Sequence, residues 1–92
     1  MVMFVWRVRD KMRVLKFEAT WCVPCKNLTK AMEGMEIPFP VERIDIDQQS
    51  DAAIEFGIRS VPTLIMMDEN NNIVKRIGGV MTKQQIEEWM TV

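Results

Sequence analysis

The stretch TWCVPCK, residues 20–26, contains both cysteines of this 92-residue chain. A single C-x-x-C pair serves either as a redox couple or as half of a metal site, so the spacing alone does not decide between them. The preceding stretch RVLKFEA, residues 13–19, alternates β-forming and polar residues and predicts a strand that ends at the cysteines. After Pro24, apolar residues such as Leu28 and Met32 recur with helical spacing. The cysteines are therefore predicted to lie where a strand passes into a helix.

This placement predicts different roles for the two thiols. Cys22 falls at the helix N-terminus, where unpaired N–H groups and the positive end of the helix dipole favour a thiolate. Cys25 falls one turn further along, close enough to form a disulfide with Cys22. We predict that Cys22 attacks and that Cys25 resolves.

Length and composition indicate a single folded domain, residues 1–92, with 48% hydrophobic and 27% charged residues. The formal net charge of −1 argues against nucleic acid or an acidic membrane as a partner. The opening MVMFVW is too short for a signal peptide or a membrane span, so we expect a cytoplasmic protein, monomeric by default. In the cytoplasm a lone cysteine pair is more often catalytic or metal-binding than structural.

The remaining sequence predicts strands and helices in the order β-α-β-α-β-β-α. The first helix stops near Gly34, and the second is predicted to start at Ser50 as N-cap and to stop at Gly57. The last helix has capping-box spacing at Thr82 and Gln85. The strands after the first are predicted at residues 41–47, 63–68 and 72–78, the last two as a hairpin. This order predicts a mixed sheet with helices on both faces.

The motif TWCVPCK resembles the active site of the thioredoxin family, usually written W-C-G-P-C-K. The resemblance extends over roughly residues 13–92, through IDIDQ (44–48), FGIRSVPTL (56–64) and the glycine pair at 78–79. It implies a thioredoxin-like α/β fold, with a central mixed sheet flanked by helices. It also implies a protein-disulfide reductase that needs no metal and no cofactor besides the Cys22–Cys25 couple. Its partners would be protein disulfides and a thioredoxin reductase or small thiol that re-reduces the couple.

The resemblance assigns surroundings to the cysteines. Trp21 is placed beside the disulfide, where it contacts partners, although a core aromatic is the alternative. Pro24 and Lys26 complete the family motif. Val23 departs from the usual glycine, and we expect it to enlarge the apolar rim around Cys22 and to alter partner choice.

A second segment is implied to bind the substrate chain. Ser60, Val61 and Pro62 form a loop with a cis proline packed against the cysteines, and the Val61 backbone pairs with the substrate. Gly78 and Gly79 leave room for that chain.

One departure concerns charge. Six positions before the first cysteine, the family usually has a buried aspartate that deprotonates the resolving cysteine, but this chain has Lys16, and the facing lysine aligns with Arg43. Two buried cations are costly. Either Lys16 is neutral and acts as the base, or Glu18 or Asp45 supplies a negative charge, or Lys16 extends to solvent without a catalytic role.

A second departure is the shortened N-terminus. The family has a strand and a full helix before the cysteine-bearing strand, whereas RDKM, residues 9–12, leaves no room for such a helix. We expect MFVWRV, residues 3–8, to pair antiparallel at the sheet edge or to lie on the surface.

Three other functions compete with the reductase. An oxidase or isomerase of this fold typically has histidine before the second cysteine, and this chain has no histidine. A glutaredoxin-like, glutathione-dependent enzyme typically has an acidic residue soon after the paired glycines, which GGVMT lacks. The third is an accessory or clamp subunit that does not use its cysteines.

Overall fold

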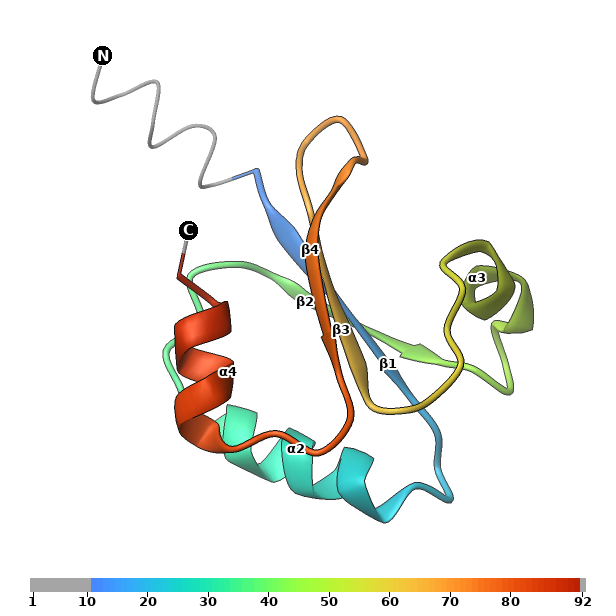
Figure 1. The fold of residues 1–92 in the computed structure, drawn as a ribbon, viewed down its shortest axis with the longest axis horizontal. Helices are drawn as coiled ribbons and strands as arrows, with labels where there is room; N and C mark the ends of the chain where they lie inside the picture. Colours follow the sequence, from blue (N-terminus) through green and yellow to red (C-terminus); the bar gives the residue numbers. More distant parts are fainter. Residues whose placement is uncertain (1–10, 92) are drawn as a thin grey trace.

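The computed structural model describes residues 11–91, and the order of its elements is the predicted one (Figure 1). The elements are β1 (Arg13–Glu18), α2 (Val23–Glu33), β2 (Val41–Asp45), α3 (Ser50–Glu55), β3 (Thr63–Met67), β4 (Ile73–Gly78) and α4 (Lys83–Trp89).

The four strands form one mixed sheet in the order β2-β1-β3-β4. β1 and β2 are parallel and are joined through α2, because a parallel pair needs a long crossover. β3 lies antiparallel to both β1 and β4. In the β3–β4 turn, Asp68 Oδ1 accepts the N–H groups of Asn70 and Asn72, and Asn71 has φ 63°. The predicted mixed sheet and hairpin are confirmed.

Helices cover both faces of the sheet, as predicted. α2 and α4 lie on one face and α3 on the other (Figure 1). Along β1, Val14 packs into the α2/α4 core and the next residue, Leu15, packs into the α3 core, because successive strand side chains point to opposite faces. Lys16 therefore shares the α2 side of the sheet with Val14.

The helix ends follow the sequence signals with one exception. Thr82 and Gln85 form the complete capping box of α4, and Gly57, with φ 64°, follows the end of α3. The prediction that Ser50 is the N-cap of α3 is wrong, because Gln49 is the cap and Ser50 is the first helical residue. The Gln49 side chain makes no capping hydrogen bond to α3.

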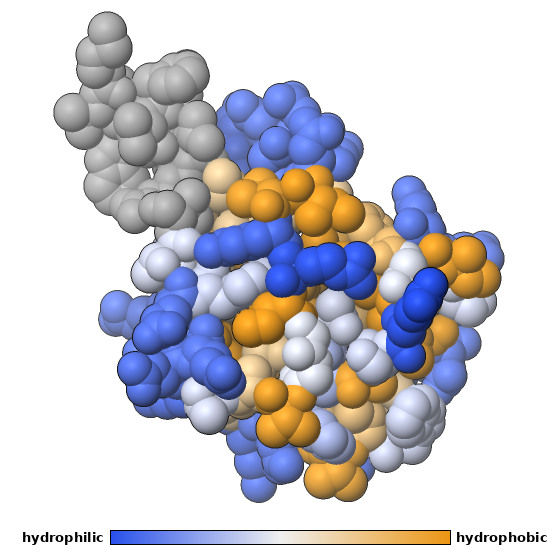
Figure 2. Space-filling model, in the orientation of Figure 1, coloured by the Kyte–Doolittle hydropathy of each residue, from blue (hydrophilic) through white to orange (hydrophobic). Residues whose placement is uncertain are grey.

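The predictions for the N-terminal segment, namely the missing helix and the placement of residues 3–8, lie outside the described residues. Within residues 11–91, each helix is too short or too polar to traverse a lipid bilayer. On the face shown in Figure 2, hydrophobic patches are interleaved with hydrophilic side chains. The described large apolar side chains with the most exposure are Trp21, Val23, Ile54, Ile73, Val74 and Val80.

Candidate active site

The two cysteines form a disulfide at the start of α2. Cys22 is the N-cap, with φ −91° and ψ 108°, and Cys25 lies in the first turn with its Cα atom 5.2 Å away. The Cys25 N–H donates to Cys22 Sγ at 3.1 Å. The sulfur of Cys22 therefore takes the place of the side-chain oxygen that usually caps a helix, and the same N–H is positioned to stabilise a thiolate there.

The loop before β3 packs against Cys22. The Val61–Pro62 peptide bond is cis, as the resemblance implied, and the Val61 carbonyl oxygen lies 3.7 Å from Cys22 Sγ. The preceding residue, Ser60, accepts a hydrogen bond from Thr63 Oγ1 through its carbonyl at 2.8 Å. This loop therefore brings a backbone carbonyl next to the sulfur that we expect to attack.

Gly78 ends β4 and Gly79 follows it, and each has a local reason to be glycine. A Cβ atom on Gly78 would lie 3.2 Å from Thr63 Oγ1. Gly79 has φ 85°, which disfavours other residues, and its N–H donates to the Pro62 carbonyl at 2.9 Å. Gly79 thus ties the end of β4 to the loop that contains the cis proline, and room for a substrate chain at Gly78 and Gly79 stays a prediction.

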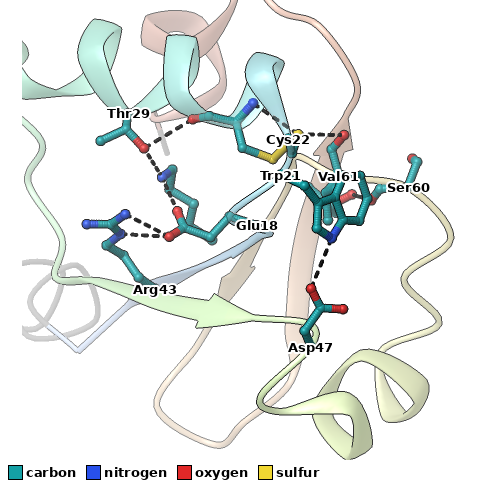
Figure 3. The surroundings of a disulfide bond; sticks show 11 residues. Glu18, Trp21, Cys22, Thr29, Arg43, Asp47, Ser60 and Val61 are labelled. Atoms are coloured by element: carbon teal, nitrogen blue, oxygen red, sulfur yellow. Dashed lines mark hydrogen bonds and ion pairs between the residues drawn. A yellow bond between two sulfur atoms is a disulfide. The ribbon is translucent and has the colours of Figure 1, made fainter.

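Trp21 lies on the surface beside the disulfide (Figure 3). Its side chain is 65% exposed, so the alternative that it is a core aromatic is wrong. The indole Nε1 donates to Asp47 Oδ2 at 2.9 Å, and Asp47 follows the end of β2. Val23, between the two cysteines, is also exposed, so Trp21 and Val23 add apolar surface next to the disulfide.

A partly buried charge cluster, formed by Lys16, Glu18 and Arg43, lies near Cys25. Lys16 Nζ donates to the Glu18 carboxylate and to Thr29 Oγ1, and the Lys16 side chain is 3% exposed. Arg43 donates to Glu18 Oε2 from Nε at 3.0 Å and from a terminal nitrogen at 2.7 Å. The Thr29 hydroxyl donates to the Cys25 carbonyl at 3.1 Å. Glu18 thus sits between two cations, and the chain of contacts reaches the second cysteine (Figure 3).

The opposite charges of Glu18 and Arg43 shift each other's pKa toward the ionised form. Burial by itself would raise the pKa of Glu18, but hydrogen bonds from Arg43 and Lys16, with their positive charges, hold that pKa below the ordinary carboxyl value. The hydrogen bond to Glu18 and its negative charge raise the pKa of Arg43. Glu18 is therefore ionised near neutral pH.

The structure discriminates among the alternatives for the two like charges. The one in which Lys16 extends to solvent is wrong, because the side chain is almost fully buried. Glu18 supplies the negative charge, whereas Asp45 Oδ1 accepts the backbone N–H of Asp47. The role of a neutral Lys16 as base stays a prediction.

A cavity of about 310 Å³ opens between this cluster and the helix. Its lining includes Cys25, Glu18, Thr29 and Arg43, together with Lys26 of the cysteine motif. Cys25 is 2% exposed and lines this cavity together with Glu18.

The geometry agrees with comparisons to known proteins. A family model for thioredoxin matches residues 3–92. The chain belongs to the thioredoxin family. The thioredoxin of Malassezia sympodialis is 35% identical over 83 residues, which cover 83% of this chain and 77% of that protein. Thioredoxin H5 of Oryza sativa subsp. japonica is 33% identical over 69 residues, 72% of this chain but 51% of that protein. The chain thus spans about half the length of the rice relative.

Solved thioredoxin structures have the same fold. The structure of Fasciola hepatica thioredoxin gives a TM-score of 0.79 at 24% identity and covers 97% of this chain and 88% of that one. That of Malassezia sympodialis thioredoxin gives 0.75 at 29% identity, over 88% and 73% of the two chains. The predicted thioredoxin-like fold, with its mixed sheet flanked by helices, is confirmed.

Two residues of this thioredoxin-family site were not predicted from the sequence. Thr29 follows Cys25 by four positions, so helical spacing alone places it beside that cysteine. Asp47 lies in IDIDQ, where the sequence indicated a matching segment but no partner for Trp21. Helical spacing would have revealed Thr29, whereas the Asp47 contact joins residues 26 positions apart and depends on the fold.

Glu18→Gln is expected to destabilise the protein by about 2 kcal/mol at neutral pH, since hydrogen bonds to charged groups contribute about that much. Because the folded-state pKa of Glu18 is lowered, its stabilisation is complete above the unfolded-state pKa and is lost as pH falls through the folded-state value. The difference between the parent and the variant should therefore shrink below about pH 4. Urea unfolding at several pH values measures it.

Glu55→Gln, an exposed substitution on α3, is the matched control and should change the unfolding free energy by less than about 0.5 kcal/mol. Equal losses in the two variants would mean that the charge cluster around Glu18 contributes nothing specific to stability.

Proposed function

We propose that this chain reduces protein disulfides by dithiol–disulfide exchange through Cys22 and Cys25. The observation that carries the proposal is the position of Cys22. Its sulfur caps α2, accepts the Cys25 N–H, and lies 3.7 Å from the Val61 carbonyl. The Cys25 N–H favours a thiolate at Cys22, and the Val61 carbonyl marks a backbone beside it that can pair with an extended chain.

The exchange takes two steps. The Cys22 thiolate attacks one sulfur of the target disulfide, and the other target sulfur leaves and takes up a proton. Cys25 then loses its proton and attacks Cys22 Sγ. This releases the second target thiol and leaves the Cys22–Cys25 disulfide, so two electrons pass to the target.

The binding surface follows from the same contacts. The target chain would extend along the Val61 backbone, with Ser60 and Pro62 on either side, and Gly78 and Gly79 would keep the end of β4 out of its way. Exposed Trp21 and Val23 offer apolar contact to it.

The partners of this reaction belong to the proposal. A thioredoxin reductase or a small thiol returns the disulfide to the dithiol, and the couple itself needs no metal or cofactor. We propose that the protein works in the cytoplasm as a monomer, in the maintenance of cell redox balance.

The test is turnover of a disulfide-bonded protein, such as insulin, with either dithiothreitol or glutathione as the reductant. We expect this chain to accelerate reduction by dithiothreitol and to gain little from glutathione. A strong preference for glutathione would favour the glutaredoxin-like alternative. No acceleration with either thiol, in a protein whose cysteines are shown to be reduced, would contradict the proposal.

A further inference from the structure

Lys16 is a buried basic residue on β1, and its side chain lies between the sheet and the helix that carries Cys25. Its side chain is 3% exposed and lies in the middle of β1, on the face covered by α2. One partner of its ammonium group, Thr29 Oγ1, donates in turn to the Cys25 carbonyl. The Thr29 side chain therefore links the Lys16 ammonium group to the backbone carbonyl of Cys25.

The other charges around Cys25 leave a positive balance. Glu18 on β1 is the anion of the cluster, and Arg43 on the neighbouring strand β2 pairs with it from the solvent side. On α2, Lys26 lines the same cavity and is exposed. The cavity that Cys25 lines thus carries two cations, Lys26 and Arg43, and one anion, Glu18, and the buried Lys16 contacts Glu18 and Thr29 of that lining. Glu33, at the end of α2, also acts on Arg43 by its charge.

Glu18 gives the buried Lys16 side chain a partner of opposite charge. A buried lysine without a partner tends to lose its proton, because burial disfavours the charged form, whereas an adjacent carboxylate favours it. The ionised Glu18 accepts a hydrogen bond from Lys16 directly. Because the Lys16 side chain is 3% exposed, its charge influences its neighbours more strongly than it would in bulk water.

We propose that Lys16 is a fixed buried cation that stabilises the thiolate form of Cys25. This deepens the proposed function, since it describes how the resolving thiol is activated. The Lys16 ammonium group lowers the energy of the Cys25 anion by its charge, and the Cys25 proton is released to water through the adjoining cavity. Lys16 acts only through Cys25, so it is a positioning residue and not a catalytic one.

The experiment titrates Cys25 alone in reduced Cys22→Ser protein, followed by the ultraviolet absorbance of the thiolate. The chain has no tyrosine, so no phenol ionises in the same range. If Lys16 stabilises the thiolate, we expect a titration midpoint of Cys25 below the free-thiol value of about 8.5. Burial in apolar surroundings alone would instead raise the midpoint above that value. Adding Lys16→Met should raise the midpoint by about one pH unit or more.

Lys30→Met is the matched control, because it removes the same charge from an exposed position of α2. It should leave the midpoint of Cys25 unchanged. A Cys25 midpoint at or above about 8.5 in Cys22→Ser protein would overturn the proposal even if Lys16→Met failed to fold. A midpoint that Lys16→Met leaves in place or lowers would overturn it as well.

This titration needs no disulfide target and no reductant turnover. A failure here would therefore leave the proposed reductase activity intact, and failure of the turnover assay would not affect the titration.

Discussion

Cys22→Ser is expected to abolish reduction of a protein disulfide, with a loss of at least about a thousandfold, as is common when a nucleophile is removed. A serine hydroxyl in the N-cap position can still accept the Cys25 N–H, so the helix start should be preserved. The hydroxyl is too weak a nucleophile to attack sulfur near neutral pH. Turnover of a disulfide-bonded protein with dithiothreitol measures the loss, and the far-ultraviolet circular dichroism spectrum reports whether the fold is kept.

Cys25→Ser is the matched variant, because it removes the other sulfur and leaves the attacking one. It should form a mixed disulfide with the target that accumulates, since the resolving step is missing. Non-reducing electrophoresis and intact mass detect this adduct. If both serine variants kept full activity in the cell, the chain would work as a clamp or accessory subunit that does not use its cysteines.

Phe17→Ala is expected to destabilise the protein by about 3–5 kcal/mol, which is a large part of the stability of a domain of this size. The Phe17 side chain is fully buried on the α3 face, and its ring centroid lies 5.6 Å from that of Phe56. Replacement by alanine removes this contact and leaves a cavity under α3, a helix of only six residues. The free energy of unfolding, measured with urea on the oxidised protein, gives the loss.

Val74→Ala is the control, since Val74 lies on β4 with 44% of its surface exposed. It should change stability by about 0.5 kcal/mol or less. Comparable losses in the two variants would contradict the assignment of Phe17 to the core between the sheet and α3.

The sequence by itself determined the order of the elements, because that order depends on local signals. Alternation along residues 13–19 predicted β1, and the capping box at Thr82 and Gln85 predicted the start of α4. Proximity of Cys22 to Cys25 at the start of α2 required only the spacing of a helix. Where the local signal was ambiguous, at Ser50, the prediction was wrong by one residue.

The tertiary structure decided how the charges near Cys25 are paired. The resemblance to the thioredoxins implied that Lys16 and Arg43 face each other. It left open whether Lys16 is neutral, whether Glu18 or Asp45 supplies a negative charge, or whether Lys16 extends to solvent. The choice of Glu18 depends on side-chain directions across two strands and on α2 covering that face, which buries Lys16. Such pairings join residues that are distant along the chain, so they follow from strand register and helix packing and not from local propensity.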